Sequence, residues 1–352
     1  MTFTLTDQMQ EIVDEQQRLG AKPIENLDPH AARAQPTPAD AVISLTEKKQ
    51  GTFKPLPVAD VEERHIAGPM PDGTLIRIYR PKLAFFQKAK DAVSPSAGQP
   101  ILIYVHGGGW VIADIDAYDG SARALANLSR AIVVSVEYRK GPESPFPAGH
   151  DDVLSVTQWI MANAEKLGGD RSRIAIAGES AGGNMAASTC LELLKAGKPT
   201  PIFELLVYPV TDLAHDEWDS YEQAKGARPL STEMLGWFGK HAVPEGSEAD
   251  PRLSILHADE ELLRQLPPTH VVLAEADPLR DQAHAFADKL SVLGVKTTVD
   301  FYPGVTHEFF GMAPLLPDAD KAQNTAAKFL RMAFHGDVED EFEANRVSVP
   351  TA

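Results

Sequence analysis

A serine flanked by glycines is the residue of this sequence best placed for nucleophilic chemistry. The run Gly178-Glu179-Ser180-Ala181-Gly182 has the spacing Gly-x-Ser-x-Gly, between the apolar run Ile174–Ala177 and a small-residue helical pattern from near Asn184. A strand, tight turn and helix in this order expose the serine oxygen. The glycines let strand and helix approach closely, and the start of the helix favours a nearby oxyanion. Five-residue patterns recur by chance, so the interpretation depends on partners elsewhere.

An acyl-transfer serine needs a base and an acid that orients this base. Asp277 closely follows the apolar run His270–Glu275, and His307 follows the last apolar run of the chain. Asp281 and Glu275 are the alternative carboxylates. His150 and His257 are also plausibly placed, but both precede the acid in the chain.

Such a serine also needs donors for the oxyanion. His106-Gly107-Gly108-Gly109-Trp110 directly follows the apolar run Ile101–Val105. Three successive glycines let backbone amides point into a cavity without side-chain obstruction. Each such donor contributes on the order of 3 kcal/mol to the transition state.

Apolar runs alternate with helical patterns over most of the chain, which predicts a mostly parallel sheet covered by helices on both faces. Val58–Ala67 and Thr74–Arg80, joined by Pro71-Asp72-Gly73, predict an antiparallel pair at one edge. Ligands of such sheets bind beyond the carboxyl ends of the strands. Further strands are expected at 101–105, 132–138, 174–177, 203–208, 270–275 and 296–302, and helices at 118–129, 151–167, 184–195, 278–293 and 321–334.

Two segments outside this alternation predict a helical cap. Residues 1–50 carry helical patterns at 6–19 and 39–48, and residues 211–251 are rich in aromatic side chains. The core is therefore expected at 51–210 and 252–336. A surface loop is expected at 84–99, and a solvated acidic tail at 337–352.

Composition narrows the classes of partner. The chain has 352 residues, 43% of them hydrophobic, and a net charge of -17, which disfavours nucleic acid and anionic membranes. Its single cysteine, Cys190, excludes an internal disulfide and a thiolate cluster. No leader pattern and no long apolar run are present, so we expect a cytoplasmic protein without stable membrane anchoring. The sequence leaves a homodimer open.

Taken together, these motifs resemble the hormone-sensitive-lipase-like branch of the α/β-hydrolases, bacterial esterases whose triad runs in the order Ser, Asp, His. The resemblance covers about Ile101 to Phe310. The residues that carry it are His106 to Trp110, Tyr138-Arg139, Pro142-Glu143, Pro145 to Ala148, Asp151-Asp152, Gly178 to Gly183, Tyr208-Pro209, Asp277 to Asp281, His307 and Phe309-Phe310.

The resemblance implies an α/β-hydrolase fold, with a mostly parallel eight-stranded sheet and a helical cap, and a carboxylesterase that needs neither cofactor nor metal. It implies Ser180 as nucleophile, His307 as base and Asp277 as acid. The oxyanion hole would consist of the amides of Gly108, Gly109 and Ala181. His106 and Gly107 would brace the glycine loop, and Glu179 would support the elbow.

The sequence departs from the usual family pattern at three positions. Glu179 stands where aspartate is common, Gln282 where an acidic residue is common, and Glu308 where glycine commonly follows the base. A carboxylate at Glu308 would either raise the pKa of His307 or narrow the pocket, which affects substrate preference and pH optimum.

The leading hypothesis is hydrolysis of small esters with short to medium acyl chains through an acyl-enzyme on Ser180. An amidase or deacetylase would use the same triad. A receptor-like binding protein of this fold would lose the base, which His307 argues against. A true lipase is disfavoured because no large apolar lid is evident.

Overall fold

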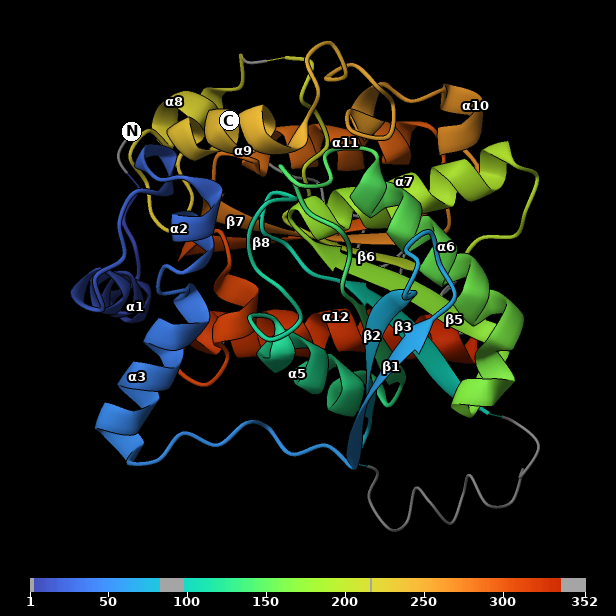
Figure 1. The fold of residues 1–352 in the computed structure, drawn as a ribbon, viewed down its shortest axis with the longest axis horizontal. Coiled ribbons are helices and arrows are strands. Elements are labelled where there is room, and N and C mark those ends of the chain that lie inside the picture. The colour runs from blue at the N-terminus through green and yellow to red at the C-terminus, as the bar shows by residue number, and fades with distance from the viewer. Residues whose placement is uncertain (1–2, 83–97, 216, 337–352) are drawn as a thin grey trace.

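Eight strands form one sheet in the order β1-β2-β4-β3-β5-β6-β7-β8, with β1 and β2 antiparallel to their neighbours and the other pairs parallel. The structure is a computed structural model that describes residues 3–82, 98–215 and 217–336; the predicted tail and most of the predicted loop at 84–99 lie outside these ranges. The expected α/β architecture is confirmed (Figure 1). The strands are β1 (Asp60–Ile66), β2 (Thr74–Arg80), β3 (Gln99–Val105), β4 (Ile132–Val136), β5 (Gly169–Glu179), β6 (Glu204–Val207), β7 (Thr269–Ala276) and β8 (Thr297–Thr306).

The central strands are apolar on both sides because each side packs on its own core. In β3, Ile101, Ile103 and Val105 belong to one buried cluster. The alternating residues Leu102 and Tyr104 belong to the other. A strand buried on both faces needs this continuous apolar run, which is why the sequence reveals it.

Helices cover both faces of the sheet. α6, α7 and α11 supply side chains to the first cluster, and α5 and α12 to the second. Figure 1 shows these two groups on opposite sides of the strands. The helices are α1 (Asp7–Arg18), η1 (Ile24–Asn26), α2 (Pro29–Arg33), α3 (Pro38–Gln50), α5 (Asp119–Ser129), α6 (Ala148–Asn163), η2 (Ala164–Leu167), α7 (Ala181–Lys195), α8 (Asp219–Gln223), α9 (Thr232–Ala242), η3 (Ile255–His257), α10 (Glu260–Leu263), α11 (Arg280–Val292), η4 (Phe309–Met312) and α12 (Pro317–His335).

Two helix starts differ from the sequence prediction. α7 begins at Ala181, three residues before Asn184, because the sharp turn at Ser180 lets Asn184 N donate to Ser180 O at 3.1 Å and close the first helical turn. α11 begins at Arg280 instead of Pro278. Asp277 accepts from Leu279 N through its side chain at 2.8 Å, so a turn precedes the helix there.

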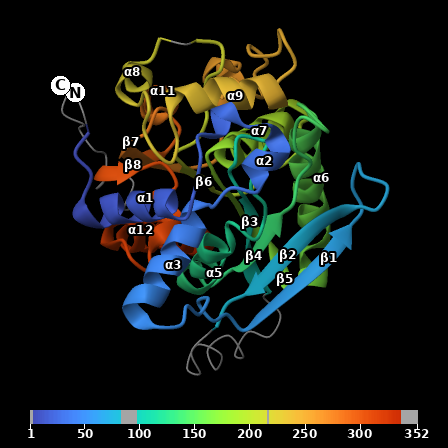
Figure 2. The same ribbon diagram turned by 60° about the vertical axis from the view of Figure 1, so that its left-hand side comes forward.

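The N-terminal helices pack in two places. α1 and α3 contribute Met9 and Val42, among others, to the cluster that contains α12. η1 and α2 lie beside α9, where Trp237 Nε1 donates to Leu27 O at 3.0 Å (Figure 2). Met9 and Val42 thus pack with α12, and Leu27 contacts α9, although both helices are far away in the sequence.

Within the described ranges, none of the helices has the length and apolar character needed to cross a lipid bilayer.

The approach of α7 to β3 explains the second glycine of the Gly-x-Ser-x-Gly run and gives a stability prediction. A Cβ added at Gly182 would lie 2.1 Å from Val105 O and 2.4 Å from His106 O. We expect Gly182→Ala to lower the free energy of unfolding by about 3 kcal/mol, because backbone atoms must move apart. Chemical denaturation followed by circular dichroism measures this loss.

The matched control is Gly236→Ala on α9. A Cβ there meets nothing within 4 Å, and Gly236 is an exposed helical residue. Alanine should therefore raise the stability by about 0.5 to 1 kcal/mol. Equal stabilities of the two variants would refute the close-approach explanation.

Candidate active site

Ser180 occupies the elbow between β5 and α7. Its backbone has φ 57° and ψ -121°, outside the regions that side chains favour, and the residue is 6% exposed. Ser180 N donates to Val207 O at 2.9 Å, and Ser180 O accepts from Val210 N at 3.2 Å. The neighbouring strand therefore holds the turn in a conformation that it would not adopt alone.

His307 and Asp277 form a buried pair at the ends of β8 and β7. His307 Nδ1 lies 2.7 Å from Asp277 Oδ2, and Asp277 is fully buried. The hydrogen bond from Leu279 N to Asp277 Oδ1 fixes the carboxylate plane. Burial lowers the pKa of His307, but the charge and hydrogen bond of Asp277, with Glu308 and Glu179 nearby, outweigh it and raise the pKa above its usual value.

The alternative acids and bases have other partners. Glu275 Oε2 accepts from Gly304 N at 2.7 Å, and Asp281 Oδ2 accepts from Ser220 N at 2.7 Å. His150 is buried between α6 and α7, where its Nε2 lies 2.9 Å from Asn184 Oδ1, and burial lowers its pKa to about 4. His257 lies beside Asp212.

The glycine loop needs its glycines for two reasons. Gly108 and Gly109 have φ angles of 106° and 56°, and a Cβ on Gly109 would lie 2.2 Å from the ring of Phe238. A Cβ on Gly107 would lie 2.3 Å from the hydroxyl of Tyr118. The amides of Gly108, Gly109 and Ala181 donate no hydrogen bond to any protein group in the described ranges.

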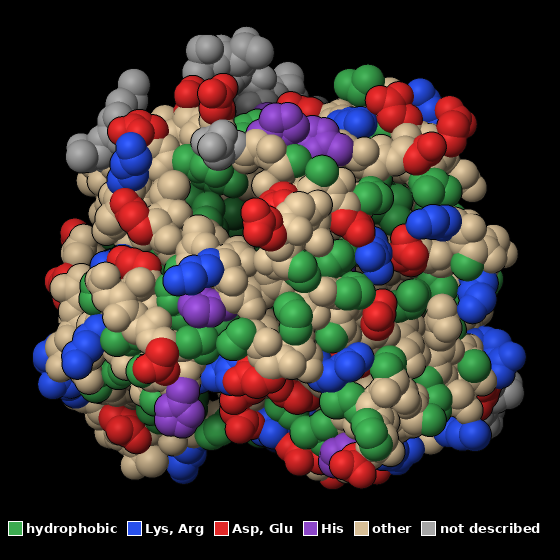
Figure 3. Space-filling view, turned by 45° about the horizontal axis from the view of Figure 1, so that its top comes forward, with side chains coloured by type: hydrophobic (Ala, Val, Ile, Leu, Met, Phe, Trp, Pro, Cys, Tyr) green, Lys and Arg blue, Asp and Glu red, His purple; other side chains and the backbone are tan. Residues whose placement is uncertain are grey.

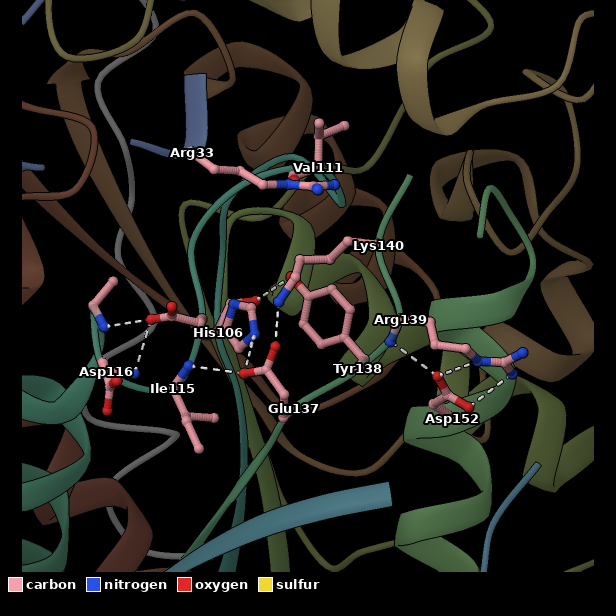
Figure 4. A network of polar contacts seen from close by, with 12 residues as sticks. Arg33, His106, Val111, Ile115, Asp116, Glu137, Tyr138, Arg139, Lys140 and Asp152 are labelled. Carbon is pink, nitrogen blue, oxygen red and sulfur yellow. Dashed lines mark hydrogen bonds and ion pairs between the residues drawn. The ribbon is translucent and has the colours of Figure 1, made fainter. Parts of the chain in front are cut away.

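His106 braces this loop from behind. Its Nδ1 donates to Gly107 O at 2.7 Å, and Tyr138 Oη donates to both His106 O and Gly107 O at 3.0 Å. Burial, together with the positive charge of Lys140, lowers the pKa of His106 to about 3, so the ring binds a proton too weakly to act as a base at neutral pH. Glu137 reaches the same region and accepts from Ile115 N at 3.0 Å (Figure 4).

Arg33 fastens the N-terminal segment to the glycine loop. Its guanidinium donates to Val111 O at 2.8 Å and to Gly141 O at 2.6 Å. It also forms two hydrogen bonds with Glu143, of 2.8 and 2.7 Å. Figure 4 shows Arg33 reaching down to the loop at Val111.

One cavity of about 340 Å³ brings these groups together. Ser180, His307, Gly108 and Gly109 line it, whereas Ala181 lies directly behind Ser180 at the start of α7. Its other walls come mainly from residues 16–39, 112–118 and 228–238. Their apolar side chains include Ile24, Ile112, Leu230, Met234 and Phe238. A volume of this size suits a small organic molecule.

Two carboxylates adjoin Ser180 and His307. Glu179 is buried and accepts from the hydroxyls of Tyr104 and Tyr208, the latter at 2.5 Å; burial, with the nearby charge of Glu308, raises its pKa to about 7. Glu308 Oε1 accepts from Tyr118 Oη at 2.5 Å and lies 3.9 Å from His307 Nε2. Burial is the main reason why the pKa of Glu308 is raised.

The charge of Glu308 gives a pH prediction. The sequence predicts His307 as the base, and a base must be neutral to accept a proton. We therefore expect activity to fall as the pH drops through the pKa of His307. Because Glu308 helps to raise that pKa, Glu308→Gln should lower it and move the acid limb of the kcat/KM profile toward lower pH. The amide can still accept from Tyr118, so the side chain keeps its place.

The control for this measurement is Glu165→Gln, which removes an exposed carboxylate paired with Arg171. Its profile should coincide with that of the unmodified protein. An acid limb of Glu308→Gln that stays in place or moves to higher pH would contradict the electrostatic role.

Three residues around the cavity were not predicted from the sequence as part of the site. Arg33 donates a hydrogen bond to Val111, which lies 78 residues away in the sequence. Tyr118 donates one to Glu308, which lies 190 residues away. Glu137 precedes the quoted Tyr138-Arg139 pair, but nothing in its neighbourhood indicates contact with the glycine loop. Glu308 itself was visible as a departure from the family pattern.

Comparison with known proteins gives a consistent family. Residues 102–311 match the model of a family described as alpha/beta hydrolase fold. The chain is 35% identical over 282 residues to carboxylesterase NlhH of Mycobacterium tuberculosis, covering 80% of this chain and 85% of that protein. It is 33% identical over 248 residues to ethyl acetate hydrolase of Pseudomonas putida, covering 70% and 74%.

Solved structures agree with these relatives. A hyperthermophilic esterase from the archaeon Pyrobaculum calidifontis superposes with a TM-score of 0.82 at 30% identity, covering 94% of this chain and all of that one. With its matched core, Gly-x-Ser-x-Gly elbow and glycine loop, the chain belongs to the α/β-hydrolases, in their hormone-sensitive-lipase-like branch.

Proposed function

We propose that the protein is a serine carboxylic-ester hydrolase that acts on esters of short to medium acyl chains. The observation that carries the proposal is the convergence on one cavity of the strained Ser180 and of His307, whose other nitrogen is held by Asp277. The esterase activities named for the relatives in Mycobacterium tuberculosis and Pseudomonas putida support it.

The proposed reaction has two halves. Ser180 Oγ attacks the ester carbonyl carbon while His307 Nε2 accepts the hydroxyl proton, and the C–O bond to the alcohol breaks as His307 returns that proton to the leaving alkoxide. A water molecule, deprotonated by the same nitrogen, then releases the carboxylic acid and restores Ser180. Asp277 holds Nδ1 protonated, so Nε2 is the nitrogen that faces the reaction.

The negative charge that develops on the carbonyl oxygen needs donors already in place. We assign this role to the amides of Gly108, Gly109 and Ala181, which no protein acceptor occupies in the described part of the chain. His106 and Arg33 act on this oxyanion hole by positioning the loop, since they donate to the backbone carbonyls of residues 107, 111 and 141, and the other hydrogen bonds of Arg33 go to Glu143.

We also assign residues 1–50 and 211–251 to a cap that bounds the cavity. Their contributions to its walls, at 16–39 and 228–238, support this division of the chain. A bounded, partly apolar cavity gains about 0.8 kcal/mol for each buried methylene until the acyl chain reaches the wall. A cytoplasmic location and a homodimeric state stay predictions.

The proposal is tested by kcat/KM for p-nitrophenyl esters with acyl chains of two to sixteen carbons, beside the matched anilides and a triglyceride emulsion. We expect a maximum between about two and eight carbons and a steep fall beyond it, because the wall then excludes the chain. Anilide cleavage faster than ester cleavage would favour an amidase. A preference for the emulsified triglyceride would contradict the bounded cavity.

A further inference from the structure

Outside the cavity, two imidazoles and a carboxylate meet where the 211–251 insertion begins and ends. His215 Nδ1 lies 3.1 Å from Asp212 Oδ2, and His257 Nε2 lies 3.2 Å from Asp212 Oδ1. One ligand atom from each of the three residues lies within 4.8 Å of the other two. We propose that Asp212, His215 and His257 form a binding site for a divalent transition-metal ion of the Zn²⁺ type.

The distances suit such an ion. Zinc binds imidazole nitrogen and carboxylate oxygen at about 2.0 to 2.2 Å, so neighbouring ligands of a tetrahedral ion lie about 3.4 Å apart. The two distances run to different oxygens of the Asp212 carboxylate, and both are close to this value. The imidazoles can approach each other because their side chains are 62% and 41% exposed. No other trio of such side chains in the described ranges meets the same geometry.

The backbone holds the ligands in fixed relation to one another. Leu256 N donates to Thr211 O at 2.9 Å and Leu213 N donates to Ser254 Oγ at 2.8 Å, which joins the segments that carry His215 and His257. Asp212 is fully buried, and its own amide donates to Gln282 Oε1 on α11 at 2.9 Å. A prearranged carboxylate between two imidazoles is a common ligand set for borderline metal ions.

The histidine side of the cluster is open to solvent. The exposure of His215 and His257 gives an ion an entry path and leaves room for water as the remaining ligand. Figure 3 shows histidine side chains gathered near the top of the view, with acidic and basic side chains close by. None of the three residues lines the cavity of Ser180, so a bound ion would clamp the two ends of the insertion together and take no part in ester hydrolysis.

The test uses the full-length protein without a histidine tag, treated with EDTA and then titrated with Co²⁺ as a spectroscopic probe. We expect visible d–d absorption that saturates near one equivalent and is displaced by Zn²⁺. At a Zn²⁺ concentration of about 100 times Kd, Tm should rise by several degrees, because the ion binds the folded state alone.

His215→Ala and His257→Ala should each weaken Co²⁺ binding at least about tenfold and abolish the rise in Tm. Their Tm values in EDTA report whether they fold. The matched control is His284→Ala, which removes a histidine 3.4 Å from Asp288 on α11 and should bind Co²⁺ as the unmodified protein does. Absence of a Co²⁺ spectrum in the unmodified protein, or an undiminished one in both histidine variants, would overturn the proposal.

Discussion

Ser180→Ala should lower kcat for p-nitrophenyl butyrate by about a millionfold, the loss seen when a serine hydrolase loses its nucleophile. The substitution removes one oxygen from a residue held by backbone bonds to Val207 and Val210. The elbow should therefore persist, and the far-UV spectrum and Tm should stay close to those of the unmodified protein. The measurement is steady-state hydrolysis at saturating ester.

A buried serine on the same helix provides the control. Ser188 lies on α7 and is 2% exposed, but it does not line the cavity. Ser188→Ala should keep nearly full activity. An organophosphonate should label one residue, Ser180, and stoichiometric labelling of any other residue would remove Ser180 from the mechanism.

Asp277→Asn should lower kcat by about ten-thousandfold. The asparagine oxygen can keep the hydrogen bond from Leu279 N, which leaves its amide NH₂ facing His307 Nδ1. That nitrogen must then accept a hydrogen bond, so the proton moves to Nε2. The base loses its lone pair on the side that faces Ser180, although every heavy atom keeps its position.

Two neighbouring carboxylates decide whether this loss is specific. Glu275→Gln alters a carboxylate that accepts a hydrogen bond from Gly304 N, and Asp281→Asn alters one that accepts from Ser220 N. Neither carboxylate belongs to the Asp277–His307 pair. Both variants should retain activity within about tenfold. If either variant lost activity while Asp277→Asn kept it, the acid would be assigned to the wrong carboxylate.

The sequence revealed the sheet because its signal is local. Strands buried on both faces must be apolar throughout, and every expected strand is present in the structure. The start of α7 was misjudged because it depends on the φ angle of Ser180, which the letters do not encode. α2 lies outside the helical patterns expected at 6–19 and 39–48, although Asp28 caps it by accepting from Ala31 N and Pro29 is its first residue.

The candidate site was partly visible for a similar reason. Ser180, Asp277 and His307 each follow a strand, and the sheet brings strand ends together. Arg33 ends α2 and Tyr118 directly precedes α5, where no such rule applies, and their contacts depend on how these two helices pack. The clustering of Asp212 with His257 was equally hidden, since a whole insertion separates the two residues.

Contacts between residues far apart in the sequence complete the cap, so they determine when the cavity can form during synthesis of the chain. Met9 contacts Thr306 across 297 residues, and Leu27 accepts a hydrogen bond from Trp237 across 210. α1 and α3, of 12 and 13 residues, are too short to persist alone in water. Met9 and Leu27 therefore wait for partners that are synthesised 297 and 210 residues later, and a nascent chain acquires its binding cavity only after those partners have left the ribosome.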